Sequence, residues 1–355
     1  MIKPKKLISK IWRPEPDSTV RNDFYRFERN ERTTLFSDEQ FSDILANLDP
    51  YDLVAYGELE PFYEKICHWL DVGRKNILLT SGSDAGIKAV FETYISEEDE
   101  VLVSLPNYAM FSVYTQIFGA KEVQHFYEKD LKLDVGSFIK KINLNTKLII
   151  VSNPGHTGRT VPKDEIVTII EEGNRNNSLV VIDEAYFQFS SETMIDFIDR
   201  FDNLLITRTF SKAFGLASLR IGLLIGSENI ISELYKVKLV HEITGVAAKI
   251  GIYMLDHMQI VDRYVDAVNQ GRIILYRRLE NIGFEVLKSE SNFLFFKTPN
   301  SLNPLELKQY LEENHILIRG PIGKHPFDDH LRITIGDEKQ MNYFCDTIEN
   351  FLINN

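Results

Sequence analysis

Lys212 is the residue of this chain whose surroundings point most directly to chemistry. It lies in the segment TFSKAFGLASLRIG (209–222), after an apolar run, and the hydroxyl side chains of Thr209 and Ser211 precede it. Arg220 follows eight residues after the lysine, so that a guanidinium can return to the same place. A lysine amine beside hydroxyl groups and an arginine can hold an anion or bond covalently to an aldehyde. The segment therefore predicts a site for an anionic aldehyde.

Two more polar residues precede this segment at similar spacing. Asp183 ends the apolar run LVVID and lies 29 residues before Lys212, and Asn153 lies 30 residues before Asp183. A lysine, a carboxylate, an amide and a set of phosphate-binding groups are what a protein needs to hold pyridoxal phosphate. The lysine bonds to the aldehyde, and the carboxylate keeps the ring nitrogen protonated so that the ring accepts electrons. The spacing therefore predicts pyridoxal phosphate as the cofactor.

The elements that must position these residues are short apolar runs with helical patterns between most of them. The runs cover 76–80, 100–106, 147–154, 178–186, 203–211 and 219–226. Continuous Ile, Val and Leu is typical of strands covered on both faces, and strand–helix alternation is typical of a doubly wound, mostly parallel sheet. Ligands of such sheets bind beyond the carboxyl ends of the strands. We therefore expect an α/β fold of three layers with the polar residues at one edge of the sheet.

The pattern changes after about residue 230. Helical periodicity covers 228–283, strand-like alternation covers 283–297, and the remainder indicates helix, strand, strand and a final amphipathic helix. The N-terminal residues are rich in proline and charge, as in an extended arm. We predict an arm over 1–41 that packs with the small domain, a large cofactor domain over 42–240, and a small α+β domain over 241–355.

The motif SKAFGLASLRIG (211–222), joined to Asn153, Asp183 and Tyr186 at their spacing, resembles the fold-type I pyridoxal-phosphate-dependent aminotransferases. Within them the chain is similar to the histidinol-phosphate aminotransferase-like group of class I/II aminotransferases. The resemblance runs from about Asn30 to the last helix. It implies a seven-stranded, mostly parallel sheet between two helical layers, beside a smaller α+β domain.

The resemblance also implies roles for single residues around the cofactor ring. Lys212 would form the Schiff base and carry protons, Asp183 would pair with the pyridinium nitrogen, and Tyr108 would stack on the ring. These three are the expected catalytic residues. Asn153 and Tyr186 would hydrogen-bond to the phenolic oxygen of the cofactor.

The cofactor phosphate would lie at a helix N-terminus, where free N–H groups and the helix dipole favour an anion. The expected phosphate-binding residues are Ser83, Asp84, Thr209, Ser211 and Arg220. In relatives, a tyrosine at the position of Tyr56, in AYGELEP, reaches this phosphate from the partner subunit. The resemblance therefore implies a homodimer whose active sites are shared.

Two arginines near the C-terminus indicate the kind of substrate. Arg332, in HLRITIG, resembles the arginine of the family that binds the α-carboxylate of the substrate. A planar guanidinium suits this role, since it can form two hydrogen bonds with one carboxylate. Arg319, in ILIRG, matches the position that binds the second anionic group. Asn30, followed by Glu31, resembles the part of the arm that closes over the substrate, and Asn292 a structural motif of the small domain.

Departures from the family pattern gather around the substrate. The loop that begins at Asn153 is one residue shorter than usual and carries His156, which we expect to face solvent, and Arg159. Arg32 replaces the usual Asn-Pro of the arm, and LVHEITG (239–245) replaces a Pro-Tyr-Pro-type segment. These changes spare the cofactor residues, so we expect an acceptor other than histidinol phosphate and leave its identity open.

The expected activity is transamination between an amino acid, glutamate in the first instance, and a phosphorylated or otherwise anionic keto or aldehyde substrate, with ping-pong kinetics. An amino-acid-phosphate decarboxylase of the same structural group is the alternative, because it would use the same cofactor residues and the same paired arginines. A nucleotide-binding dehydrogenase is disfavoured, because no Gly-x-Gly-x-x-Gly follows the first strand.

Composition excludes some other classes of protein. The 40 basic and 52 acidic residues give a net charge of −12, which argues against a nucleic-acid partner. No apolar stretch has the length of a signal peptide or a membrane span, so we expect no membrane partner and a cytoplasmic protein. Cys67 and Cys345 are expected to be reduced thiols, and the eight scattered histidines predict no metal site.

Overall fold

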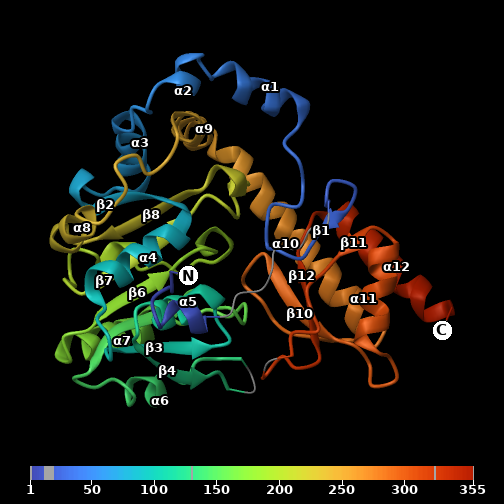
Figure 1. Ribbon diagram of the computed structural model, residues 1–355. Coiled ribbons are helices and arrows are strands. Elements are labelled where there is room, and N and C mark those ends of the chain that lie inside the picture. The colour runs from blue at the N-terminus through green and yellow to red at the C-terminus, as the bar shows by residue number, and fades with distance from the viewer. Residues whose placement is uncertain (1, 12–19, 129–130, 324, 355) are drawn as a thin grey trace.

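The computed structural model describes residues 2–11, 20–128, 131–323 and 325–354, and its largest element is a seven-stranded sheet (Figure 1). Residues 1 and 12–19 of the predicted arm lie outside the described residues. The strand order is β2-β8-β7-β6-β5-β3-β4, in which only β8 runs antiparallel to its neighbours. The strands are β2 (Ile77–Ser81), β3 (Glu100–Leu105), β4 (Lys121–Phe126), β5 (Thr146–Ser152), β6 (Leu179–Asp183), β7 (Leu204–Thr209) and β8 (Ile221–Gly226).

Alternate residues of the central strands face two different helical layers. Leu148 and Ile150 of β5 belong to a cluster with α4 (Gly82–Tyr94), α5 (Ala109–Ile117) and α8 (Glu228–Tyr235). Ile149 and Val151 pack on the other side, in the cluster that includes α3 (Glu60–Leu70), α6 (Val135–Ile139), α7 (Lys163–Arg175) and α9 (Gly245–Asp256). Because the central strands are apolar on both faces, each face is covered by helices. The expectation of a three-layer, mostly parallel α/β fold is confirmed.

The strand β4 has no counterpart among the runs that the sequence indicated. Its sequence, KEVQHF, is mostly polar, and only His125 is fully buried. Among the described residues the strand pairs with β3 alone, at the edge of the sheet. An edge strand needs no continuous apolar run, so the pattern used for the central strands did not reveal it.

A second, three-stranded antiparallel sheet follows in the C-terminal part of the chain. It consists of β9 (Glu285–Val286), β10 (Phe293–Lys297) and β12 (His330–Thr334) in the order β12-β10-β9, with α11 (Pro304–Glu313) and α12 (Glu338–Asn354) beside it. The arm joins this part of the molecule, because β1 (Tyr25–Arg26) pairs in parallel with β11 (Ile316–Leu317). After the arm, α1 (Asp38–Ala46) and α2 (Tyr51–Val54) lead to the large sheet.

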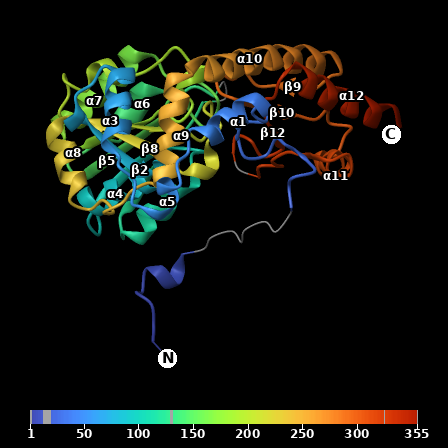
Figure 2. The same cartoon turned by 90° about the horizontal axis from the view of Figure 1, so that it is seen from above.

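The helix α10 (Met258–Asn281) runs from the large sheet to the small one, as Figure 2 shows. Near its middle, Gly271 lies against the backbone after β12, and a Cβ atom there would come within 2.1 Å of the carbonyl oxygen of Gly336. The preceding helix, α9, packs against α3, where Gly251 leaves room for the ring of Phe62. The boundary at 240/241 stays a prediction, and α9 lies among the helices of the large sheet.

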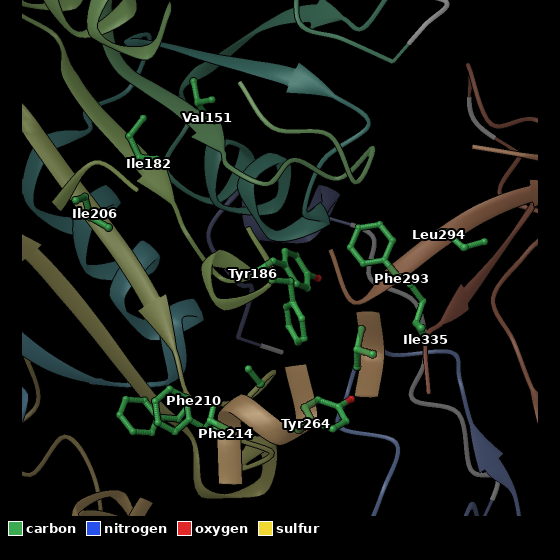
Figure 3. Packing of buried hydrophobic residues seen from close by; sticks show 14 of the residues in the cluster. Val151, Ile182, Tyr186, Ile206, Phe210, Phe214, Tyr264, Phe293, Leu294 and Ile335 are labelled. Carbon is green, nitrogen blue, oxygen red and sulfur yellow. The ribbon is translucent and has the colours of Figure 1, made fainter. Parts of the chain in front are cut away.

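Apolar packing continues from the large sheet into the small one without a break (Figure 3). Tyr186, which follows β6, meets Phe293 of β10 edge to face, with ring centroids 5.2 Å apart. Phe210 and Phe214, which follow β7, stack on each other at 4.1 Å. The contact of Tyr186 with Phe293 joins the loop after β6 to the small sheet, whereas Phe210 and Phe214 pack the loop after β7 against α3.

A buried ion pair supports the ends of the same two strands. The Arg208 guanidinium of β7 donates through Nε (3.0 Å) and Nη2 (2.8 Å) to Oε2 of Glu184, directly after β6. The second carboxylate oxygen accepts from the N–H of Met194 (2.6 Å), and Arg208 also donates to Oγ1 of Thr193 (2.7 Å). Both charged side chains are less than 5% exposed. Each charge is therefore compensated, and the loop that follows β6 is tied to β7.

Removal of one partner of this pair is expected to be strongly destabilising. The variant Glu184→Ala leaves the Arg208 charge buried without its carboxylate and should lower the free energy of unfolding by about 3–5 kcal/mol. Chemical denaturation followed by circular dichroism measures the change. The exposed pair Glu233–Lys236 is the control, and Glu233→Ala should cost no more than about 1 kcal/mol. Equal losses in the two variants would contradict the assigned role of the buried pair.

Candidate active site

The carboxyl ends of β5, β6 and β7 lie at one edge of the large sheet, so the polar residues that end or follow these strands gather there. In the register of the parallel strands, Ser152 of β5 pairs with Asp183 of β6, and Asp183 pairs with Thr207 of β7. Since β8 is antiparallel, its first residue returns to this edge and pairs with Ser81 at the end of β2. Arg220 directly precedes β8 and therefore lies at the edge where β5, β6 and β7 end.

Asp183 is a buried acid at this edge. Its side chain accepts from the N–H of Ala185 (3.2 Å), and its carbonyl accepts from the N–H of Asn153 (2.9 Å). Burial raises the pKa of Asp183 to about 6, although the nearby Lys212 acts in the opposite direction. A buried carboxyl with so few hydrogen bonds is stabilised in its charged form when a cationic N–H donor binds to it.

Lys212 projects from the loop after β7. The stacked rings of Phe210 and Phe214 hold this loop, and the N–H of Gly215 donates to the carbonyl of Lys212 (3.0 Å). The lysine Nζ lies 5.7 Å from the ring centre of Tyr186 and donates to the carbonyl of Arg29 in the arm (3.3 Å). The amine is therefore half-buried between the large sheet and the arm, and it forms no ion pair in the part of the chain that the structure describes.

The first turn of α4 forms a cup with the residues around β8. A Cβ atom on Gly222 would lie 2.3 Å from the N–H nitrogen of Ser83, and one on Gly82 would lie 2.3 Å from Nη2 of Arg220. Gly82 also has a left-handed backbone (φ 75°), which favours glycine. The two glycines thus allow a guanidinium and a strand to approach the N-terminus of a 13-residue helix.

Hydroxyl groups complete the cup on the side of β7. Thr209 donates to Ser211 (2.9 Å), and Arg220 Nη1 lies 3.5 Å from the same serine oxygen. Both hydroxyl residues are buried, whereas Arg220 is exposed. N–H groups, hydroxyls and a guanidinium facing one place are the donors that a phosphate monoester needs.

Tyr108 stands at the other side of the cup, where it precedes α5. Its hydroxyl donates to Oδ1 of Asp84 in the first turn of α4 (3.3 Å). Burial, together with the Asp84 carboxylate, raises the pKa of Tyr108, so its hydroxyl stays protonated at neutral pH. The predicted residues Ser83, Asp84 and Tyr108 are thus neighbours in the structure.

Asn153 and Tyr186 are both buried, but their partners differ. The Asn153 amide bonds to the backbone of Val161 through Nδ2 (3.1 Å) and Oδ1 (2.8 Å), which leaves one N–H free to donate. The hydroxyl of Tyr186 accepts from Nδ2 of Asn30 in the arm (3.0 Å). Asn30 therefore contacts a predicted cofactor residue.

Arg332 and Arg319 lie side by side as a two-residue antiparallel bridge, with backbone hydrogen bonds of 3.0 and 2.7 Å. Arg332 Nη2 donates to the carbonyl of Glu28 (2.8 Å), while its Nε is buried without a hydrogen-bond partner among the described residues. Burial lowers the pKa of Arg332, and Arg319 acts in the same direction. Two neighbouring arginine side chains, one of which has a buried Nε donor to spare, form a receptor for an anion.

Tyr56 is a predicted cofactor residue that lies at the surface of the molecule. Its side chain is 77% exposed and stacks on His241, with ring centroids 4.0 Å apart. It lines a cavity of about 580 Å³ together with Arg220 and Ser81. Its approach to a neighbouring subunit's phosphate stays a prediction.

The shortened loop after Asn153 is held by the small domain. Glu290 accepts from the N–H (2.9 Å) and the hydroxyl of Thr160, and its own N–H donates to the carbonyl of Gly158 (2.6 Å). His156, expected to face solvent, is partly buried instead, with its ring 6.4 Å from that of Phe293. The sequence did not predict the contact between Thr160 and Glu290, because the two residues are 130 positions apart and both are of polar types common on protein surfaces.

The sequence also did not predict the ion pair of Arg208 with Glu184 or the position of Arg32. Arg32 lies between the rings of Phe36 (4.7 Å) and Tyr264 (4.5 Å), against Gly215 of the Lys212 loop. The change from the family's Asn-Pro to Arg32 was visible in the sequence, but its aromatic partners come from distant segments.

These residues fit pyridoxal phosphate. The glycine-lined cup at α4 offers donors for its phosphate, and Asp183 offers a buried carboxyl for a cationic ring nitrogen. Lys212 lies between them and the arm. In the described ranges, no three His, Cys, Asp or Glu side chains are grouped as metal ligands would be. The helices within those ranges include none that is both long and apolar enough for a membrane span.

Sequence comparison places the chain among known enzymes. The pattern of the family aminotransferase class I and II matches residues 51–348. A histidinol-phosphate aminotransferase of Thermoanaerobacter pseudethanolicus is 31% identical over 334 residues, which are 93% of each chain. One of Sulfurisphaera tokodaii is 32% identical over 301 residues, with 82% of this chain and 81% of the relative covered.

Solved structures share the fold at lower sequence identity. The histidinol-phosphate aminotransferase of Sinorhizobium meliloti, in complex with pyridoxal-5'-phosphate, matches with a TM-score of 0.87 at 20% identity over 99% of both chains. The L-threonine-O-3-phosphate decarboxylase of Porphyromonas gingivalis matches at 0.75 and 20% identity, over 91% of this chain and 99% of its own. The family pattern and the relatives above 30% identity each cover most of the sequence. This chain therefore belongs to the class I and II aminotransferases, and the prediction of a pyridoxal-phosphate-dependent aminotransferase is confirmed.

Proposed function

We propose that this aminotransferase moves an amino group between glutamate and a phosphorylated or otherwise anionic keto or aldehyde compound. One observation on the arm carries the proposal. Lys212 donates to the carbonyl of Arg29, and Arg332 donates to the carbonyl of the preceding residue, Glu28. The reactive amine and the guanidinium for a carboxylate are thus held by neighbouring arm residues. An amino acid bound to Arg332 by its α-carboxylate would have its α-carbon beside Lys212.

The cofactor would be held by the groups at the sheet edge. Bound pyridoxal phosphate supplies a ring that withdraws electrons from the α-carbon of the substrate. Asp183 would accept a hydrogen bond from the ring nitrogen, and Tyr108 would cover the ring. Asn153 and Tyr186 would donate to the phenolic oxygen. The phosphate would lie in the cup made by Ser83, Asp84, Thr209, Ser211 and Arg220.

Lys212 would move the proton. Its amine would take a proton from the α-carbon of the substrate and would donate one at C4′ of a bound cofactor. The arm lies beside this amine, because the carbonyl of Arg29 accepts a hydrogen bond from it. Both substrates would use the same arginines in turn, so the first product leaves before the second substrate binds, as in ping-pong kinetics.

The second anion of the substrate would bind to Arg319. This arginine is exposed, unlike Arg332, so its side chain can reach the anionic groups of substrates that differ in length. The phosphate of an amino substrate or the side-chain carboxylate of glutamate would suit it. The names of the relatives in the comparison make histidinol phosphate the first amine to test, although the chain departs from the family pattern at Arg32 and His156.

A homodimer with shared active sites is part of the proposal. Apolar side chains around the Tyr56–His241 stack are exposed to an extent unusual for a monomer, among them Leu53, Val54 and Val240. A second copy would cover them. Tyr56 of the partner subunit would then reach the phosphate through the cavity that Arg220 lines. Such a dimer would work in the cytoplasm, where the free thiols of Cys67 and Cys345 stay reduced.

The variant Lys212→Ala tests the site. Because the lysine bonds covalently to the cofactor, the purified variant should lack the visible absorbance band that the wild-type protein shows with pyridoxal phosphate. Transamination should fall by at least about 1,000-fold. Circular dichroism serves as the control for folding. A visible band that persists in a folded Lys212→Ala variant would show that another residue binds the aldehyde.

The variant Arg332→Ala tests recognition of the carboxylate. Loss of a charge-assisted, two-bonded contact should lower kcat/KM for glutamate by about 100-fold while the cofactor stays bound. Arg319→Ala should instead affect the phosphorylated partner more than glutamate. Loss of cofactor from the Arg332→Ala protein would show that Arg332 binds the cofactor and would contradict its assignment to the substrate carboxylate.

Incubation with glutamate alone separates the two candidate reactions. A transaminase should transfer the amino group to its cofactor, lose the visible band and release one equivalent of 2-oxoglutarate. The paired arginines would equally fit a phosphorylated amino acid, whose decarboxylation would release carbon dioxide and leave glutamate untouched. Carbon dioxide from a phosphorylated amino acid, together with no reaction of glutamate, would favour the decarboxylase.

A further inference from the structure

Asn30 in the arm is held tightly by its surroundings. It is 2% exposed and has a left-handed backbone (φ 56°). Its N–H donates to Oγ1 of Thr334 (2.9 Å), and its carbonyl accepts from Nδ2 of Asn292 (3.2 Å). Both backbone groups of Asn30 are therefore anchored to the small sheet.

The same contacts determine which way the Asn30 amide points. The Thr334 oxygen accepts from the N–H of Asn30, so the hydroxyl proton is available to donate to Oδ1 of Asn30, 3.3 Å away. The amide nitrogen must then face Tyr186, whose oxygen lies 3.0 Å from Nδ2. An amide nitrogen only donates, so the Tyr186 oxygen is the acceptor of this hydrogen bond.

The hydroxyl proton of Tyr186 consequently points away from Asn30. Among the described residues, the structure gives this hydroxyl no other hydrogen-bond partner. The tyrosine is buried beside Lys212, at the edge where the cofactor would bind. A buried O–H without an acceptor is unfavourable unless a ligand supplies one.

We propose that Asn30 is a positioning residue that acts through Tyr186: it occupies the tyrosine oxygen and so directs the tyrosine proton toward the phenolic oxygen of the cofactor. The inference rests on the proposed function. It assigns Asn30 to the orientation of a cofactor ligand, in addition to the contact with substrate expected from the sequence.

The chemical effect follows from charge. A hydrogen bond received from Asn30 stabilises negative charge on the Tyr186 oxygen, which makes its O–H a stronger donor. A stronger donor stabilises negative charge on the phenolic oxygen of the cofactor. The nitrogen that links Lys212 to the cofactor then has a lower proton affinity than it would have without Asn30.

The arm also connects this contact to the carboxylate site. Arg332 and Thr334 are two residues apart in β12 and so lie on the same face of the small sheet. Arg332 holds the carbonyl of Glu28, and Thr334 holds the N–H of Asn30. The strand that would bind the substrate carboxylate therefore also sets the direction of the Tyr186 proton.

The variant Asn30→Gly tests the proposal without adding charge, because glycine adopts the left-handed backbone readily. The readout is the pH midpoint of the visible absorbance band of the holoenzyme. Loss of one neutral hydrogen bond should raise the proton affinity of the chromophore about fivefold, so the midpoint should move to higher pH. An unchanged midpoint would overturn the proposal.

A double-mutant cycle with Tyr186→Phe separates positioning from a structural role. If Asn30 acts through the tyrosine hydroxyl, Asn30→Gly should shift the midpoint in the wild-type background and leave it unchanged in the Tyr186→Phe background. A full shift in both backgrounds would show that Asn30 acts independently of Tyr186 and would overturn the proposal.

Thr334 offers a second route if the glycine variant does not fold. Thr334→Val keeps the shape and removes the hydroxyl that orients the amide, so it should shift the midpoint in the same direction, and Thr334→Ser should restore the wild-type value. Equal midpoints in the valine and serine variants would contradict the orientation mechanism. Absence of a visible band from the wild-type protein with pyridoxal phosphate would instead contradict the proposed function itself.

Discussion

The shared direction of β5, β6 and β7 is the constraint on which the rest of this molecule depends. Parallel strands present their carboxyl ends at one edge, so residues that follow strands far apart in the chain become neighbours there. The one antiparallel strand, β8, adds a residue from its beginning and brings Arg220 to the same edge. The helical layers cover these strands on both faces.

This dependence explains what the sequence could and could not predict. Asp183 and Lys212 adjoin continuous apolar runs, so their meeting at one edge followed from the strand pattern alone. The edge strand β4 has no such run. The hydrogen bond between Asn30 and Tyr186 joins residues 156 positions apart, and no local pattern contains that information. The structural role of Glu184 could not be predicted either, because its partner, Arg208, lies 24 residues further along the chain.

Adjacent acids at the end of β6 illustrate two ways of treating a buried charge. Both carboxylate oxygens of Glu184 accept hydrogen bonds from donors of the chain, and Arg208 balances the charge. Asp183 receives only sparse hydrogen bonds and has a raised pKa. Arg332 is the cationic counterpart, with a buried Nε that lacks a partner among the described residues. The Glu184–Arg208 pair therefore stabilises the fold, whereas Asp183 and Arg332 can still bind ligands.

The contact of Gly271 with Gly336 limits the motions that are open to the small sheet. Backbone lies against backbone there, and even a single methyl group would collide with the carbonyl oxygen. The small sheet is therefore packed directly on the backbone of α10, and little space is left at this point for the two to move relative to each other.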